Sequence, residues 1–167
     1  MQINKLRLPK AFTLKWIEAL RSGKYIQGDE YLCEEYRIDE NTMGYYHCCL
    51  GVAVELLEKI PYPIMDINII GEDEFDETEV EGWIHYGYPK ELIDFRDELG
   101  ISNAIPMLFA ELNDGTNITY LKSKYAERLF PDAIPEYLLS RVDSTGGIKL
   151  SFEEIADFIE QEFELYD

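Results

Sequence analysis

The pattern of hydrophobic positions centres on residues 45–54, where a short aromatic segment leads directly into an apolar one. The first three of these residues are typical of the end of a strand, and Cys48 or Cys49 then begins a helix that continues to Ile60. Apolar residues occupy most of its circumference, and a helix with that distribution is normally buried in the middle of a domain. Pro61 prevents it from continuing. We therefore expect the rest of the chain to fold around this helix.

Helical spacing of apolar residues predicts several further helices, and local signals mark their ends. Thr13 is a candidate N-cap for the first of them, and Gly23 and Gly100 suit the left-handed position that follows a helix. Ser151 and Glu154 form a capping box before the last helix. The predicted helices are 14–21, 90–99, 104–112, 118–130, 136–142 and 152–163.

Short aromatic segments between turn residues predict a small antiparallel sheet. The paired segments are 25–27 with 31–33, and 36–38 with 43–47. Residues 1–10 form an arm or short edge strand, and residues 64–70 are a candidate strand. The predicted fold class is α+β: a mainly helical single domain, residues 1–167, with a small antiparallel, tyrosine-rich sheet.

The charge of the chain limits its possible partners. It has 34 aspartates and glutamates but only 15 lysines and arginines, for a formal net charge of −19. Such a surface repels phosphate groups, which argues against direct binding of DNA or RNA. It would attract basic partners, including proteins that normally hold nucleic acid. The simpler alternative is that the charge only keeps the protein soluble. The densest acidic run is a predicted loop at 71–82, which contains no lysine or arginine.

The sequence also bears on location. No apolar run approaches the roughly 20 residues that a membrane helix needs. The N-terminal residues have no apolar core and no small-residue cleavage site, so no secretion signal is predicted. Three cysteines, an odd number, do not make a disulfide framework. We expect a cytoplasmic protein with free thiols and no membrane partner.

The candidate catalytic residues are Cys48 and Cys49 with His85. A cysteine in the first turn of a helix lies at the positive end of the helix dipole, which favours the nucleophilic thiolate. His85 would be the base, because neighbours on a strand point to opposite faces and this disfavours His47. The alternative, which we favour, is that both cysteines are small residues packed in the core.

Neither a metal site nor a cofactor is predicted. Zinc favours ligand pairs such as C-x-x-C or H-x-x-x-H, and neither pattern occurs among the candidates Cys33, His47, Cys48, Cys49 and His85. The acidic run lacks the EF-hand arrangement, so a solvated loop is favoured over weak calcium binding. No glycine-rich loop has the lysine that would cradle a phosphate.

Four segments together carry a family resemblance. Residues 16–27 and 48–52 follow the pattern W-x-x-A-L-x-S-G-x-Y-x-Q and then C-C-L-G-V, while Leu112-Asn113-Asp114 and 151–160 form the closing part, with S-F-x-E-I-A-D. These segments resemble small uncharacterised proteins of bacteriophage and prophage genomes. The resemblance implies a viral protein acting in the cytoplasm of a bacterial host. It also implies that residues 115–150 are an insertion, and it assigns no reaction.

Three functions remain open. The leading hypothesis is an acidic phage protein that binds a basic host or defence factor, with mimicry of nucleic acid charge as its sharpest form. Its expected binding residues are Glu72, Asp73, Glu74, Asp76, Glu77, Glu79, Glu81 and Trp83. The second is a cysteine-dependent hydrolase or transferase that uses Cys48 or Cys49 with His85. The third is a sponge that holds a small nucleotide signal in an aromatic pocket, with lysine or arginine for its phosphate.

Overall fold

A computed structural model describes residues 6–29, 32–57, 96–102 and 104–167. The candidate strand 64–70, the acidic run 71–82 and most of the predicted helix 90–99 lie outside the described residues. Residues 96–99 are helical, and Gly100 follows them with the predicted positive φ of 65°.

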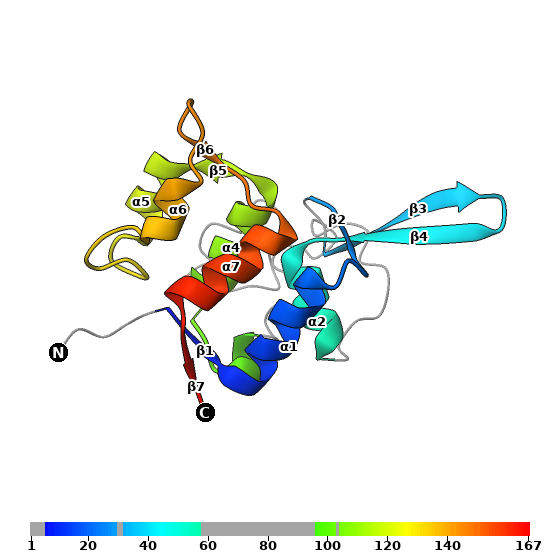
Figure 1. The fold of residues 1–167 in the computed structure, drawn as a ribbon, viewed down its shortest axis with the longest axis horizontal. Coiled ribbons are helices and arrows are strands. Elements are labelled where there is room, and N and C mark those ends of the chain that lie inside the picture. Colours follow the sequence, from blue (N-terminus) through cyan, green and yellow to red (C-terminus); the bar gives the residue numbers. More distant parts are fainter. Residues whose placement is uncertain (1–5, 30–31, 58–95, 103) are drawn as a thin grey trace, which may run out of the picture.

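Figure 1 shows a body of helices from which one hairpin projects. The helices are α1 (Lys10–Arg21), α2 (Cys49–Leu56), α4 (Ala104–Asp114), α5 (Ile118–Tyr125), α6 (Glu136–Ser140) and α7 (Phe152–Glu162). The strands are β1 (Arg7–Pro9), β2 (Ile26–Gln27), β3 (Cys33–Asp39), β4 (Thr42–His47), β5 (Thr116–Asn117), β6 (Gly147–Ile148) and β7 (Glu164–Tyr166). The predicted α+β class, a small and mainly helical domain, is confirmed.

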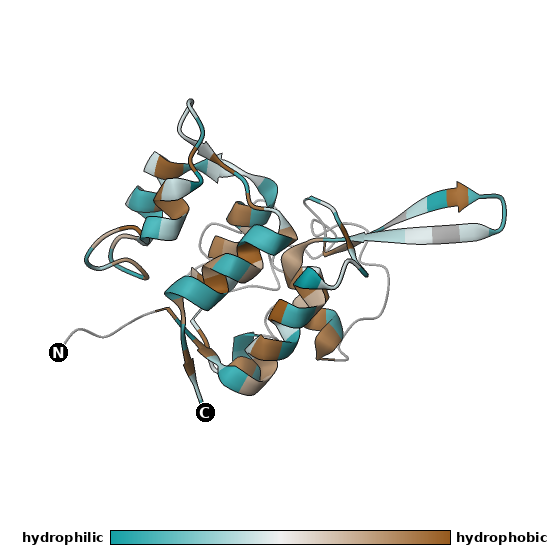
Figure 2. Cartoon of the chain, in the orientation of Figure 1, coloured by the Kyte–Doolittle hydropathy of each residue, from teal (hydrophilic) through white to brown (hydrophobic). Residues whose placement is uncertain are grey.

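The core lies where α1, α2, α4 and α7 pack against one another. Trp16 of α1 meets Phe109 of α4 edge to face, with ring centroids 4.9 Å apart. Phe109 also stacks on Phe163, directly after α7, at 5.6 Å. The side of α7 that faces the viewer in Figure 2 is largely hydrophilic, and its apolar side is turned into this core. The helical periodicity of the sequence therefore identified the buried faces correctly.

The capping box at the start of α7 is confirmed. The Oγ of Ser151 accepts a hydrogen bond from the backbone N–H of Glu154 at 3.2 Å, and the Ser151 N–H donates to Glu154 Oε1 at 3.1 Å. The prediction that Thr13 is an N-cap is wrong, because α1 begins immediately after Pro9, where β1 ends. Thr13 is thus buried inside the helix.

Other helices end a few residues away from the predicted positions, because tertiary contacts determine where a helix ends. The helix α4 continues to Asp114, two residues beyond the predicted end, and Gly115 follows at a φ of 101°. The helix α5 ends at Tyr125, although apolar spacing continued to residue 130. The side chains of Leu121, Tyr125 and Leu138 are fully buried. The segment 115–150 therefore contributes to the core of the domain.

The main sheet has the strand order β2-β4-β3. The predicted hairpin of 36–38 with 43–47 is confirmed as β3 and β4, which pair antiparallel. The predicted hairpin of 25–27 with 31–33 is not formed. Instead β2 pairs with β4 in parallel, with Ile26 opposite Tyr46, so the sheet is mixed and not purely antiparallel. The cause is a non-local anchor: the Gln27 side chain bonds to groups far along the chain, which fixes β2 beside β4.

A second sheet joins the two ends of the described chain. The edge strand predicted within residues 1–10 is β1, and it pairs in parallel with β7 near the C-terminus. Leu8 of β1 is fully buried opposite Leu165. A third small sheet pairs β5 with β6.

The first turn of α2 is pressed against the backbone of Leu32. The N–H of Cys48 donates to the Leu32 carbonyl at 3.3 Å. A Cβ atom added at Gly51 would lie 1.8 Å from the same carbonyl oxygen, far inside any allowed contact. Glycine is therefore required at this position by the close approach of two backbone segments.

We expect Gly51→Ala to destabilise the fold by about 3 kcal/mol or more, because α2 must move away from Leu32 and repack the core. Urea unfolding followed by circular dichroism measures the change. Gly23→Ala is the matched control: its φ is 74° with open space around it, so the added methyl group costs only the left-handed backbone strain of about 1 kcal/mol. Equal losses for the two variants would contradict the close-packing explanation.

Candidate functional site

The two adjacent cysteines shape the start of α2. Cys48 is the N-cap residue in an extended conformation, and its Sγ accepts the N–H of Gly51 at 3.4 Å. Cys49 is fully buried; its thiol donates to the carbonyl of Phe109 at 3.5 Å, and its own carbonyl accepts the indole N–H of Trp16 at 3.0 Å. Both side chains thus hold core elements together.

Burial controls the chemistry of these thiols. It raises the pKa of Cys48 to about 12 and raises the pKa of Cys49 well above its usual value. The helix N-terminus does favour a thiolate, but removal from water outweighs that effect here. His85 lies outside the described residues, so the proposed Cys–His pair is not placed. Within the described chain, the cysteines have the packing role that we favoured.

A polar network that the sequence did not predict lies behind Cys49. The buried Asn113 side chain accepts the N–H of Cys49 at 3.1 Å and the Nε2–H of Gln27 at 3.0 Å. Its amide nitrogen donates to the carbonyl of Gly28 at 2.9 Å and to a carboxylate oxygen of Asp114 at 3.0 Å. The carboxamide uses its full hydrogen-bonding capacity, which indicates a structural role.

Gln27 extends this network to α7. Its Nε2 also donates to the carbonyl of Leu150 at 2.9 Å, and its Oε1 accepts the N–H of Phe152 at 3.0 Å. All four segments that carry the family resemblance therefore meet here, through Gln27, Cys49, Asn113 and Phe152. The only signal in the sequence was that Gln27 and Asn113 both lie in segments that carry the family resemblance. Their contacts with each other could not be deduced from their spacing along the chain.

His47, Glu55 and Tyr25 form a second polar group beside α2. The Nε2 of His47 lies 2.9 Å from a carboxylate oxygen of Glu55, and the His47 and Tyr25 rings meet edge to face at 5.0 Å. The contact with Glu55 is not aligned as a hydrogen bond. Burial, only partly opposed by Glu55, lowers the pKa of His47, and burial followed by the Glu55 charge raises the pKa of Tyr25. His47 is therefore a neutral imidazole at neutral pH.

The β3–β4 hairpin projects away from the helices (Figure 1). On one of its faces, the rings of Tyr36 and Tyr46 lie 4.4 Å apart. The Tyr36 ring covers Gly44, where an added Cβ would lie 2.4 Å from Cζ. Toward the solvent, Ile38 and Tyr45 are 57% and 40% exposed. The hairpin is thus braced internally and presents apolar side chains outward.

The hairpin tip is negatively charged. Asp39 and Glu40 are exposed there. Hydrogen bonds from the backbone N–H of Asn41 and then from Thr42 lower the pKa of Asp39, so this carboxylate is ionised at neutral pH. An acidic tip therefore ends an arm with exposed apolar residues.

Elsewhere on the described surface, several of the basic side chains already face acids. Arg21 contacts both Asp157 and Glu160 of α7, and the hydrogen bonds that its guanidinium donates to Glu160 and Asp157 raise its pKa further above its usual value. The other pairs join Arg7 to Glu164, Arg96 to Asp97, Lys124 to Glu111, Arg141 to Glu154 and Lys149 to Asp29. These pairs leave the excess of acids uncompensated. The predicted binding residues between 72 and 83 lie outside the described residues.

Two features are absent from the described residues. No three histidine, cysteine, aspartate or glutamate side chains in this part of the chain come together to hold a metal ion. No helix among the described segments has the length and hydrophobicity required to cross a bilayer.

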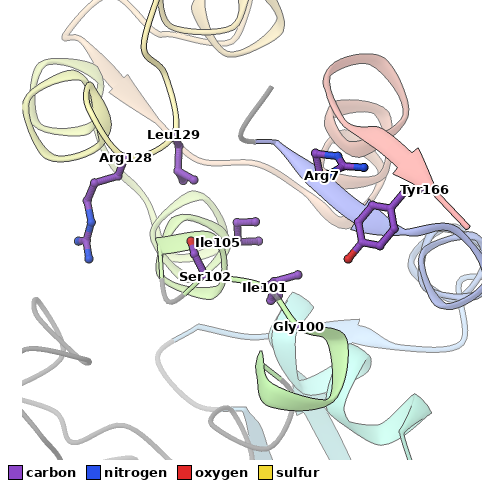
Figure 3. A pocket seen from close by; sticks show the side chains of 8 residues that line it. All are labelled: Arg7, Gly100, Ile101, Ser102, Ile105, Arg128, Leu129 and Tyr166. Atoms are coloured by element: carbon purple, nitrogen blue, oxygen red, sulfur yellow. The ribbon is translucent and has the colours of Figure 1, made fainter. Parts of the chain in front are cut away.

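A pocket of about 330 Å³ lies between the β1–β7 sheet and the start of α4 (Figure 3). Its lining residues are Arg7, Gly100, Ile101, Ser102, Ile105, Arg128, Leu129 and Tyr166. Two of these are arginines and none is acidic. No local pattern in the sequence predicts this pocket, because its walls come from distant segments.

Comparison with known proteins gives one family match. The family model described as "Domain of unknown function (DUF8296)" matches residues 10–163. Comparisons with curated proteins and with solved structures gave no match.

We expect the cysteines of the folded protein to resist alkylation, because Cys33, Cys48 and Cys49 are all buried. At neutral pH, iodoacetamide should modify them far more slowly than free cysteine, and urea should restore the ordinary rate. Mass spectrometry of the peptides after a timed reaction measures this for each residue. Modification of Cys48 or Cys49 at the free-cysteine rate without denaturant would show that a sulfur is reachable.

We expect His47 to make the fold less stable in mild acid. Its pKa is lowered by burial from the usual 6.5, so the unfolded state binds more protons just below that pH, and the free energy of unfolding falls as pH drops from about 7.5 to about 5.5. Urea unfolding across this range measures the slope. His47→Gln should give a flatter dependence. An identical slope for both would exclude His47 as the cause.

Proposed function

The chain belongs to the family of domains of unknown function DUF8296, since the family model covers residues 10–163. We propose that it is a bacteriophage protein that binds a basic host or defence protein of a bacterium. Binding, not catalysis, is its proposed mode of action. The acidic surface and the projecting hairpin are the proposed binding elements, together with the acidic run 71–82.

The observation that carries this proposal is the β3–β4 hairpin. Ile38 and Tyr45 expose apolar surface to water on an arm that extends away from the core (Figure 1). Tyrosine and large aliphatic side chains on a braced element are suited to the centre of a protein interface, where they lose little conformational entropy on binding. A partner that covers them removes this apolar surface from water.

Charge supports a basic partner. The net charge of −19 and the ionised Asp39 at the tip would speed the encounter with a positively charged surface. A protein whose natural ligand is nucleic acid presents such a surface, which is the basis for proposing mimicry of nucleic acid charge. The bacteriophage origin rests on the resemblance of the four segments that meet at Gln27 and Asn113.

The cysteine-dependent alternative has less support. A nucleophilic sulfur must reach its substrate as a thiolate, whereas burial raises the pKa of Cys48 and Cys49. Cys49 is in addition committed to contacts with Trp16 and Phe109. These contacts favour binding over cysteine catalysis.

The test uses the tagged full-length protein as bait in a bacterial lysate, with captured proteins identified by mass spectrometry. We expect capture of a basic protein that is released as salt rises from about 0.1 M to about 1 M, because the screening length falls from about 10 Å to about 3 Å. Affinity for that protein is then measured with variants. Asp39→Asn with Glu40→Gln, and Ile38→Ser with Tyr45→Ser, should each weaken it by about tenfold.

The matched control is Leu139→Ser, which removes an apolar side chain that is 53% exposed on α6, away from the hairpin. It should leave the affinity unchanged. A further variant with amides in place of the acids between residues 72 and 81 tests the acidic run. Capture of no basic protein, or capture that survives 1 M salt, would refute the proposed function. Equal losses for the hairpin and Leu139 variants would refute the role of the hairpin.

A further inference from the structure

We propose that the pocket between the β1–β7 sheet and α4 binds a small organic phosphate, with the phosphate at an arginine and an aromatic or other apolar group on the floor. The proposal does not depend on the proposed function, because it concerns different residues. Figure 3 shows that Arg7 and Arg128 lie on opposite sides of this pocket.

The first argument is the sign of the charge. Acids outnumber bases by 34 to 15 in this chain, yet the eight lining residues in the described part of the chain include two arginines and no acid. Guanidinium groups bind phosphate through paired N–H donors, and Arg7 and Arg128 each place one such group at an edge of the pocket, on opposite sides of it (Figure 3). Ser102 adds a hydroxyl group at the N-terminal end of α4, where the helix dipole also favours negative charge. The described lining of the pocket is thus positively charged, although the protein as a whole is acidic.

The second argument is that Arg7 is held in place but remains able to bind an anion. Its Cζ lies 4.7 Å from the centre of the Tyr166 ring, which limits the orientations of the guanidinium plane. Its Nε is 3.6 Å from Glu164 Oε1, and both side chains are about half exposed. An ion pair of that kind contributes at most about 1 kcal/mol, so a doubly charged phosphate can compete with it.

The third argument is the apolar floor. Ile101, Ile105 and Leu129 lie between the two arginines (Figure 3). The hydroxyl of Tyr166 bonds to the carbonyl of Leu99 at 3.4 Å, which positions its ring at the edge of this floor. A volume of about 330 Å³ is at the small end of the range for ligand sites, which suits a single nucleotide or an aryl phosphate. A simple inorganic anion would leave the floor uncovered.

The test is calorimetric titration of the full-length protein with three probes: adenosine monophosphate, adenosine and inorganic phosphate. We expect the monophosphate to bind with a Kd of about 0.1 mM, and the two partial ligands to bind at least about tenfold more weakly. Amide hydrogen exchange should slow at residues 7, 8 and 164–166, because the ligand would cover the β1–β7 pair. No saturation by the monophosphate, or equal binding of inorganic phosphate alone, would overturn the proposal.

Variants locate the site. One of the variants Arg7→Gln and Arg128→Gln, the one that removes the arginine at the phosphate, should weaken monophosphate binding by about tenfold, and a loss from neither would overturn the proposal. Ser102→Trp should abolish monophosphate binding by filling the pocket from an exposed position. The matched control is Arg37→Gln, an exposed arginine on the hairpin, which should leave the Kd within about twofold. Circular dichroism confirms that each variant is folded. A loss for Arg37→Gln equal to that of the pocket arginines would show only nonspecific attraction and would overturn the proposal.

Discussion

The contact between the first turn of α2 and the backbone of Leu32 fixes the arrangement of the domain. Gly51 permits this approach, since any Cβ would collide with the Leu32 carbonyl, and the Cys48 N–H bonds to the same oxygen. The position of α2 then determines where β4 enters it and where α1 and α4 pack beside it. The hairpin therefore projects in a direction set by a backbone contact at its base.

The polar network of Gln27 and Asn113 completes this arrangement. It joins β2, the start of α2, the end of α4 and the start of α7, which are far apart in the sequence. Buried amides that are fully hydrogen-bonded specify one arrangement of the elements, because any other would leave polar groups unpaired. The segments that carry the family resemblance thus contain the residues that hold the fold together. They do not point to a reaction, and the residues that contact a partner must be sought on the surface.

The features that could be predicted from the sequence are those with local causes. The capping box at Ser151, the β3–β4 hairpin and the buried character of α2 depend on neighbouring residues or on periodicity. The parallel pairing of β2, the start of α1 before Thr13 and the role of Asn113 depend on contacts across the chain, which spacing does not encode. For the cysteines, the start of the helix does lower the thiol pKa, as expected from the sequence. Burial raises it by more, so the net effect is a raised pKa.

The two proposed binding surfaces lie in different parts of the molecule. The hairpin extends from one side of the helical body, whereas β1 and β7, which wall the pocket, lie on another (Figure 1). They share no residue, and one packed route between them is α4, which borders the pocket at Ile105 and reaches the base of the hairpin through Asn113. On this route Asn113 is held by four hydrogen bonds, which fix the end of α4 against Gln27, Gly28 and Cys49. Coupling requires an element with two states, so an effect of bound phosphate on the hairpin would require these hydrogen bonds to rearrange.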